Sequence, residues 1–237
     1  MKAFLLAAGR GTRISKKIAE IPKCTLDVGG KPLVLRTVEM LLANNIDVTI
    51  IVGYKHRYIE EVLAGKDVTI VYNPFFDVTN SIASLWLAKD YMVAEDTIVA
   101  NADVFWSQEL LDKMIANAKC EDVFMLSDVR RADDGDYFFN IVGDCITAYG
   151  KELKRDERNA EYVGIAYMSS SFTQAFKERL EELIDNQHHN VWWENVLYSY
   201  IGDREIKAMD VGDTFWSEID FIEDYYRINE YLANRNQ

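Results

Sequence analysis

The chain has 237 residues, 49% of them hydrophobic, and a formal net charge of −13. This is enough for one large domain with a sizeable core, and the acidic balance argues against nucleic acid as a partner because a polyanion is repelled at long range. The three widely spaced cysteines indicate no disulfide framework, and the absence of a signal peptide or a span of ~20 apolar residues predicts a cytoplasmic protein without membrane insertion.

Apolar residues alternate between strand and helix periodicity along the first 127 residues. Patterns typical of buried strands fall at 2–8, 48–53, 68–72, 97–100 and 122–127. Patterns typical of helices lie between them, at 33–44, 56–63, 81–91 and 107–118. Ser107 is placed to cap the last of these helices. The alternation predicts an α/β fold with three layers and a Rossmann-like, mostly parallel sheet.

The pattern changes after residue 127. A β-hairpin is predicted around Gly143 and Asp144. Further elements are expected as a strand at 162–168, helices at 172–184 and 193–201, a strand near 206–211 and a helix from about 221 to 233. We expect a single domain over 1–237, in which 1–127 form the core, 128–205 form a small hairpin and helical insertion, and 206–237 complete the core.

The first predicted strand runs into a loop that contains Gly9, Gly11 and Arg13. Glycines let backbone N–H groups approach phosphate oxygens closely, and basic side chains supply charge. Residues 10–36 hold seven basic and two acidic residues, a local charge of +5 in an acidic chain. Ile14 stands where a dinucleotide-binding fingerprint needs its third glycine. The loop therefore indicates a small anionic ligand, with a tight turn or a solvated basic loop as the alternatives.

Three carboxylates are candidates for metal binding. Asp103 follows the strand at 97–100, and ligands of open α/β sheets bind at the carboxyl ends of strands. Mg²⁺ in proteins takes few carboxylates together with substrate phosphates. Glu218 and Asp220 share a face if the chain is extended there, so both could reach the same ion. The alternative for these two acids is compensation of a helix dipole.

A group of neighbouring residues, Trp192, Trp193 and Glu194, follows a polar stretch at 186–190. Aromatic faces with a carboxylate are typical of a pocket for an ammonium group, above all a quaternary one. Packing in the core is the alternative for these aromatics. The interface of a homodimer is a further use for the exposed aromatic residues of this half.

Several motifs together resemble the nucleotidyltransferase superfamily, whose members couple nucleoside triphosphates to phosphorylated small molecules. They are the string from Leu6 to Arg13, Pro22 with Lys23, Gly30 to Leu33, Asp103, and Glu218 to Asp220. Tyr72 to Pro74, Asn80 to Trp86 and Asn101 to Val104 look like the bacterial CTP:phosphocholine cytidylyltransferases within it. Ala102 stands where the sugar-1-phosphate branch usually has glycine.

The resemblance implies a role for each matching position. Lys23 and Arg13 would be catalytic, and Asp103 and Asp220 would hold Mg²⁺. The nucleotide would be bound by Leu6, Ala7, Ala8, Gly9, Gly11, Thr12, Arg13, Lys23, Asn80, Ser81 and Ala102. The acceptor would be bound by Asp103, Tyr162, Trp192, Trp193, Glu194 and Glu218.

The implied reaction is transfer of CMP from CTP to a small phosphorylated or phosphonate amine, with phosphocholine first. The acceptor oxygen would attack the α-phosphorus in line and expel pyrophosphate, with charge neutralised by Lys23, Arg13 and Mg²⁺. The alternatives are a 2-aminoethylphosphonate or phosphoethanolamine cytidylyltransferase, a sugar-1-phosphate nucleotidyltransferase, and a non-catalytic nucleotide-binding regulator.

Overall fold

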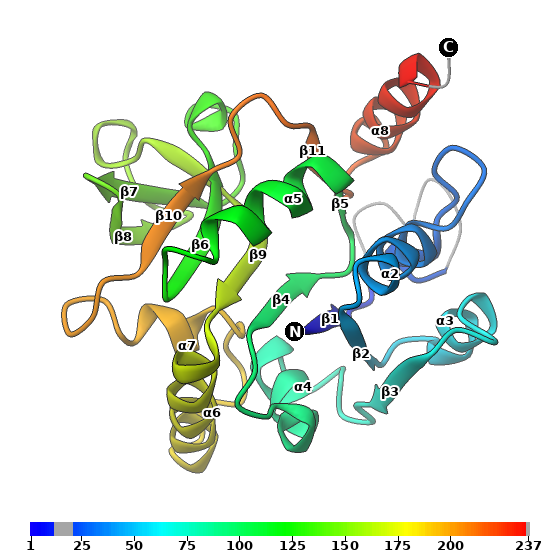
Figure 1. Cartoon of the computed structure of the whole chain (residues 1–237), viewed down its shortest axis with the longest axis horizontal. Helices are drawn as coiled ribbons and strands as arrows, with labels where there is room; N and C mark the ends of the chain where they lie inside the picture. Colours follow the sequence, from blue (N-terminus) through cyan, green and yellow to red (C-terminus); the bar gives the residue numbers. More distant parts are fainter. Residues whose placement is uncertain (12–20, 236–237) are drawn as a thin grey trace.

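The computed structural model of the chain describes residues 1–11 and 21–235 (Figure 1). Within these residues, nine strands form one sheet in the order β3-β2-β1-β4-β9-β6-β10-β8-β7. The strands are β1 (Lys2–Ala7), β2 (Asp47–Val52), β3 (Val68–Tyr72), β4 (Thr97–Asn101), β6 (Val123–Asp128), β7 (Phe138–Val142), β8 (Cys145–Gly150), β9 (Ala160–Met168) and β10 (Lys207–Asp210). A separate antiparallel pair joins β5 (Val104–Trp106) to β11 (Trp216–Glu218).

The expected α/β class is confirmed by the strand directions. Strands β1 to β4 run parallel to one another, and β6 runs parallel to β10. The expected hairpin is formed by β7 and β8. After it the chain returns through β9, which lies antiparallel between β4 and β6 and so joins the two parallel groups in one sheet.

Helices cover both faces of the sheet. One face carries α2 (Leu33–Ala43), α3 (His56–Val62) and α5 (Gln108–Asn117), and the other carries α4 (Ser81–Leu87), α6 (Ser170–Asp185) and α7 (Asn195–Tyr198). Side chains of strand β1 pack into both helical layers, because successive side chains of a strand point to opposite faces. Leu5 packs with the first group of helices and Phe4 with the second.

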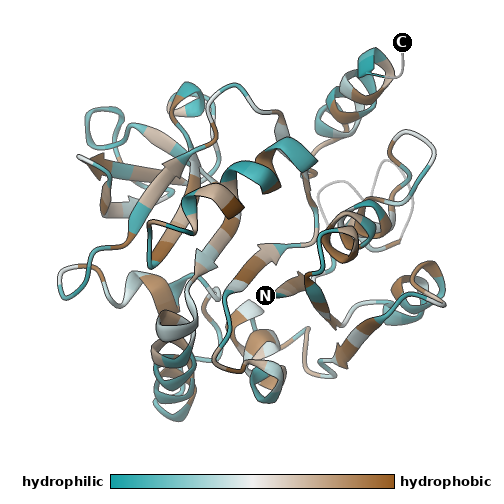
Figure 2. Ribbon diagram, viewed as in Figure 1, coloured by the Kyte–Doolittle hydropathy of each residue, from teal (hydrophilic) through white to brown (hydrophobic). Residues whose placement is uncertain are grey.

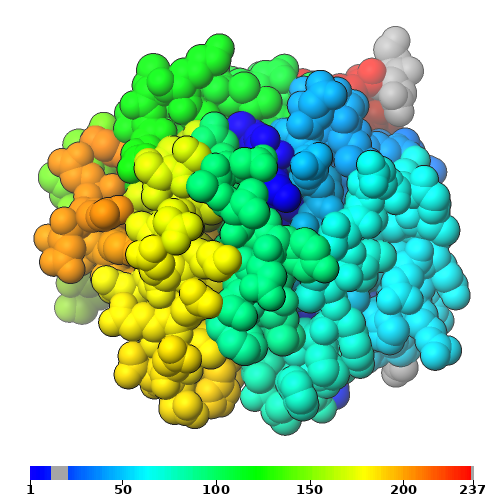
Figure 3. Space-filling model, turned by 60° about the horizontal axis from the view of Figure 1, so that its bottom comes forward, coloured from blue at the N-terminus to red at the C-terminus, as the bar shows by residue number. Residues whose placement is uncertain are grey.

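The outer surfaces of the helices are polar and the strands are apolar. Figure 2 shows hydrophobic residues along the central strands and hydrophilic residues along much of α6. Figure 3 shows α6, in yellow, side by side with the teal-green segment that contains α4. Helix α8 (Ile222–Arg235) packs at one end, where Ile228 joins Phe105 and Ile219 in a small third cluster. Among the described helices, none is long and apolar enough to cross a membrane.

Several element boundaries differ from the expected ones. The helix predicted over 81–91 ends at Leu87 and continues as the 3₁₀ turn η2 (Lys89–Tyr91). The helix predicted over 193–201 is reduced to the four residues of α7. The predicted cap is confirmed, since the Ser107 hydroxyl accepts a bond from the Leu110 N–H at 3.4 Å.

Gly164 in β9 leaves too little space for a Cβ unless its neighbours shift. Its φ is +89°, and a Cβ would lie 3.0 Å from Val104 Cγ2 and 3.2 Å from Asn101 Nδ2. We therefore expect Gly164→Ala to lower the free energy of unfolding by about 2–3 kcal/mol through backbone strain and crowding, measured by urea denaturation.

Gly143 in the hairpin turn is the matched control for that substitution. It also has a positive φ, +67°, but a Cβ there meets nothing within 4 Å. Gly143→Ala should lose only the backbone contribution of about 1 kcal/mol. Equal losses in the two variants would show that the contact between β9, β5 and Asn101 is not tight.

Candidate active site

Two adjoining cavities lie at the carboxyl ends of the central strands. The loop cavity, of about 210 Å³, is lined by Leu6, Ala8, Gly9, Phe76, Thr79, Asn80, Ser81, Ser84, Asn101, Asp103, Trp192 and Glu218. The aromatic cavity, of about 310 Å³, is lined by Lys23, Ser81, Asn101, Asp136, Tyr137, Lys151, Glu161, Tyr162, Gly164, Trp192, Glu194, Tyr198, Glu218 and Asp220. The two cavities share a wall made of Ser81, Asn101, Trp192 and Glu218.

The glycine-containing loop is held at the end of β1 by its neighbours. The Leu6 carbonyl accepts a bond from Ala102 N–H, and the Ala8 carbonyl accepts one from Tyr54 N–H, both at 3.0 Å. Gly11 lies directly against Lys23, because a Cβ on Gly11 would come within 2.4 Å of Lys23 Cγ. The structure thus brings the loop and the lysine together.

Not every residue of the expected nucleotide site lines a cavity. Leu6, Ala8 and Gly9 do, as do Asn80 and Ser81 at the start of α4. Lys23 lines the aromatic cavity, whereas Gly11 lines neither cavity and packs against Lys23. Ala7 and Ala102 are buried in the core, and Thr12 and Arg13 lie outside the described residues.

Lys23 joins two carboxylates that are distant in sequence. It begins the 3₁₀ turn η1 (Lys23–Thr25), and its Nζ donates to Asp220 and lies 3.6 Å from Asp103 Oδ2. Pairing of β5 with β11 makes this possible, since Glu218 is in register with Val104 and the Ile219 N–H donates to the Asp103 carbonyl at 3.0 Å. Asp103, Glu218 and Asp220 therefore converge on one side of the cavities.

The cluster holds three carboxyl groups and one ammonium group. Burial raises the pKa of Asp103, although Lys23 opposes part of that rise. Burial together with Asp103 and Asp220 raises the pKa of Glu218 well above its ordinary value. Burial acts to lower the pKa of Lys23, but Asp103 and Asp220 outweigh it and raise that pKa, so the lysine is a firm cation.

These residues fit a magnesium ion that is shared with a substrate. Among the described residues, no three His, Cys, Asp or Glu side chains form a complete metal site on their own. Mg²⁺ seldom needs a site made of protein side chains alone, because it commonly binds one or two carboxylates and completes its coordination shell with phosphate oxygens and water. The burial that disfavours negative charge on Asp103 is the environment in which such a cation is stabilising.

The aromatic cavity is walled by four rings. Tyr137 lies 5.5 Å from Trp192 and 6.1 Å from Tyr198 between ring centres, and Tyr162 lies 6.3 Å from Tyr137. Tyr162 and Trp192 were predicted from the sequence, whereas Tyr137 and Tyr198 were not placed in the site. Their only local signal was an aromatic residue within a predicted strand or helix, which core packing explains equally well.

Glu194 is a buried carboxyl inside this aromatic wall. Its exposed fraction is 6%, and burial raises its pKa to about 7. The Asn101 amide donates to its Oε1 at 3.5 Å. In the part of the chain that the structure describes, no lysine, arginine or histidine forms an ion pair with it. A cationic group in the cavity would supply that missing partner.

Trp193 lies apart from the site that was expected to include it. It is completely buried in the core, and its indole N–H donates to Asn101 Oδ1 at 3.1 Å. Its backbone N–H donates to Ser81 Oγ at 2.9 Å. Trp192, by contrast, is 41% exposed and lines both cavities. Trp193 thus supports the shared wall from behind while Trp192 forms part of it.

Fold and site together define a nucleotidyltransferase. A family described as the MobA-like NTP transferase domain matches residues 3–201, and the chain belongs to that family.

The resemblance to bacterial choline-phosphate cytidylyltransferases is confirmed by relatives that match along nearly the whole chain. One is the CTP:phosphoglutamine cytidylyltransferase of Campylobacter jejuni, 28% identical over 94% of this chain and 97% of the relative. Another is the choline-phosphate cytidylyltransferase of Streptococcus pneumoniae, 26% identical over the full length of both. Among solved structures, the inositol-1-phosphate CTP transferase of T. maritima has the same fold, with a TM-score of 0.80 at 21% identity over 98% of this chain and 96% of that one.

Removal of the Lys23 ammonium should leave the fold intact and slow the reaction. We expect Lys23→Ala to lower turnover roughly 10²–10³-fold, as for the loss of one preorganised charge donor, measured by pyrophosphate release. Because Asp103, Glu218 and Asp220 would then repel one another, Mg²⁺ should raise the melting temperature more in this variant than in the wild type.

Lys66 provides the control for this loss of charge. It is also a partly buried lysine in an ion pair, with Glu39 at 2.7 Å, but it lies outside both cavities. Lys66→Ala should keep normal turnover. Near-normal turnover in Lys23→Ala would contradict the catalytic role.

Proposed function

We propose that this nucleotidyltransferase transfers CMP from CTP to a small phosphorylated or phosphonate amine and releases pyrophosphate, with phosphocholine as the first candidate acceptor. The observation that carries this proposal is Glu194, a buried carboxyl ringed by aromatic side chains and without a cationic partner among the described residues. An ammonium group on the acceptor would satisfy both the carboxyl and the rings.

The choice of CTP rests on the relatives. The proteins of Campylobacter jejuni and Streptococcus pneumoniae are both named as cytidylyltransferases, although their acceptors differ. These relatives share the nucleotide and differ in the acceptor. Two separate cavities, one for each substrate, would allow this. The loop cavity is built mainly by residues before 104, and the aromatic cavity largely by residues of 128–205. This supports assigning 1–127 to the nucleotide, 128–205 to the acceptor and 206–237 to completion of the core with the metal acid Asp220.

Among amine acceptors, the ring geometry favours a quaternary ammonium. A trimethylammonium group has no N–H to donate, so it binds through aromatic faces and net negative charge. A primary ammonium needs two or three hydrogen-bond acceptors, which Glu194, Asp136 and Glu161 could provide. Phosphoethanolamine and 2-aminoethylphosphonate therefore remain the next candidates. A neutral sugar would leave Glu194 unpaired.

The shared wall determines where the two substrates meet. Ala8, Gly9 and Gly11 would hold the triphosphate on the loop side, with Asn80 and Ser81 near the base. An acceptor whose ammonium lies at Glu194 would direct its phosphate toward Lys23 and Asp103. Its oxygen is already ionised, so bond formation to the α-phosphorus and departure of pyrophosphate need no general base.

Charge on the reacting phosphates is the main barrier, because both substrates are anions. Lys23 lies beside the carboxylates of Asp103 and Asp220 and lines the aromatic cavity. Mg²⁺ held by Asp103 and Asp220 would supply further neutralisation when bound. Because Lys23, Asp103 and Asp220 are all present and in contact, catalysis is favoured over a purely nucleotide-binding role.

The direct test is a pyrophosphate-release assay with each nucleoside triphosphate, crossed with phosphocholine, phosphoethanolamine, 2-aminoethylphosphonate and glucose-1-phosphate. We expect the highest kcat/KM for CTP with phosphocholine. Preference for glucose-1-phosphate would overturn the amine assignment, and no turnover with any pair would support the binding-only alternative.

The ionisation of Glu194 should appear in the pH dependence. Burial raises its pKa to about 7, with Asn101, Tyr162 and Asp103 around it, so the group is neutral below that pH and charged above it. Since the acceptor ammonium pairs with the charged form, kcat/KM for the acceptor should fall as the pH drops from 8 to 6.

Glu194→Gln separates this effect from titration of the acceptor phosphate, whose own pKa lies near 6. The variant should lose about 10- to 100-fold in kcat/KM at pH 8, the loss expected for a bond to a charged group. The pH profile of kcat/KM in this variant should also lose the inflection near pH 7 that is assigned to Glu194. An unchanged inflection in the variant would assign it to another group.

A further inference from the structure

Lys151 lines the aromatic cavity, so its ammonium group lies in the space proposed for the ammonium of the acceptor. It follows β8, and its Nζ lies 3.1 Å from Asp136 Oδ2 and 5.8 Å from the centre of the Trp192 ring. Both members of this ion pair line the cavity. The chain's own cation thus occupies the face of a ring that would bind an acceptor ammonium.

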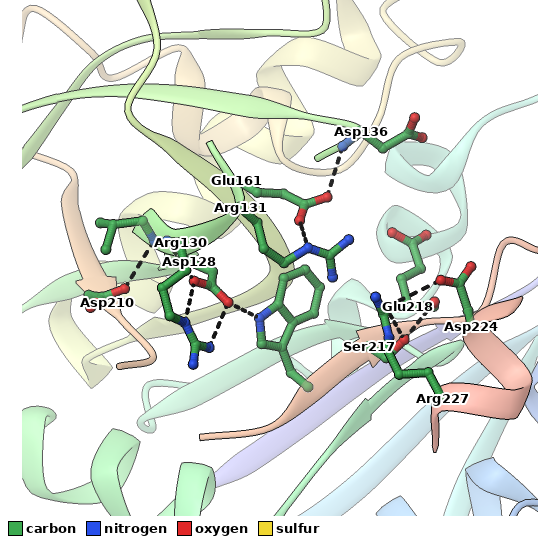
Figure 4. A network of polar contacts seen from close by, with 12 residues as sticks. Asp128, Arg130, Arg131, Asp136, Glu161, Asp210, Ser217, Glu218, Asp224 and Arg227 are labelled. Atoms are coloured by element: carbon green, nitrogen blue, oxygen red, sulfur yellow. Dashed lines mark hydrogen bonds and ion pairs between the residues drawn. The ribbon is translucent and has the colours of Figure 1, made fainter. Parts of the chain in front are cut away.

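Asp136 is anchored from beneath by a buried network (Figure 4). Its backbone N–H donates to Glu161 Oε1 at 2.8 Å, and Glu161 Oε2 pairs with Arg131 Nε at 2.7 Å. Glu161 is only 4% exposed, and the Arg131 guanidinium lies over the Trp216 ring at 4.8 Å. The aspartate therefore has a defined position relative to the sheet.

Gly135 makes this anchor possible. A Cβ at this position would lie 2.7 Å from Glu161 Cδ and 2.8 Å from its Cγ, so any other residue would displace the carboxyl side chain. Lys151 differs from Asp136 in length, since its ammonium is carried on a long flexible stem; both side chains are partly exposed, 38% for Lys151 and 53% for Asp136. Because the backbone at Asp136 is anchored, the longer lysine side chain has the greater range of movement.

We propose that Lys151 and Asp136 form a strap across the aromatic cavity, in which the lysine ammonium occupies the Trp192 face and is displaced by the ammonium of the acceptor. This rests on the proposed function for the chemistry of the acceptor. Two cations on one indole face would repel each other, so either Lys151 leaves or the acceptor presents an anionic group to it. The carboxyls of Asp136, Glu161 and Glu194 disfavour the anionic group, which leaves displacement.

Displacement makes Lys151 a specificity-determining residue. An exposed ion pair and an exposed cation–π contact are each weak, so a cationic acceptor can replace both. The same acceptor then gains Asp136 as a second carboxylate. A neutral acceptor gains nothing from the exchange, and the strap stays closed against it.

The first test compares acceptor kinetics of Lys151→Met, Lys151→Arg and Lys154→Met. Loss of the competing cation in Lys151→Met should lower the KM for phosphocholine about three- to tenfold, the range of one weak contact, with kcat unchanged. Lys151→Arg keeps the cation and should not lower KM. Lys154 is the matched control, since it lies three residues further along the same connecting segment but is 76% exposed and outside the cavity.

Two results of this test would overturn the strap. An unchanged KM in Lys151→Met would show that Lys151 does not compete. A raised KM would show that it binds the acceptor instead, which would indicate an anionic group at that end.

A second measurement does not depend on turnover. Calorimetric titration with choline, which lacks the phosphate, should show tighter binding to Lys151→Met than to the wild type, and equal affinities would overturn the strap. If the wild type releases no pyrophosphate with any acceptor, the proposed function fails. In that case the comparison of choline affinities between Lys151→Met and the wild type still tests whether Lys151 competes with a bound ammonium group.

Discussion

One ion cluster holds the parts of this site together. Lys23 contacts Asp103 and Asp220, which come from opposite halves of the chain and flank the paired strands β5 and β11. Buried carboxylates of like charge are unfavourable without a counter-ion, so the lysine compensates them in the fold. Because Gly11 packs directly on Lys23, the glycine-containing loop belongs to the same unit.

A second constraint aligns the two cavities. Asn101 accepts a bond from the buried Trp193 indole and donates one to Glu194. Trp193 in turn donates its backbone N–H to Ser81. The wall between the loop cavity and the aromatic cavity is therefore set by core packing.

The aromatic cavity combines fixed and movable charges. Glu161 is tied to Arg131, and it fixes the backbone of Asp136, whereas Lys151 reaches the rim on a flexible side chain. Glu194 lies among the rings and forms no ion pair with a cation of the described residues. In the proposed function Glu194 would pair with the cation of the acceptor, and in the proposed strap Lys151 would compete with that cation for the Trp192 ring.

The sequence by itself determined the α/β class, the family and the strand-end positions of the loop and Asp103, because apolar periodicity and short motifs are local properties. It placed Trp192 and Trp193 together in the site, whereas the fold turns one toward the cavities and the other into the core. Tyr137, Tyr198 and Lys151 carry no local mark that separates a cavity wall from ordinary packing or a solvated surface. Only tertiary structure decides such positions, since it brings β7, β8, β9 and α7 around one space and inserts β9 antiparallel between β4 and β6.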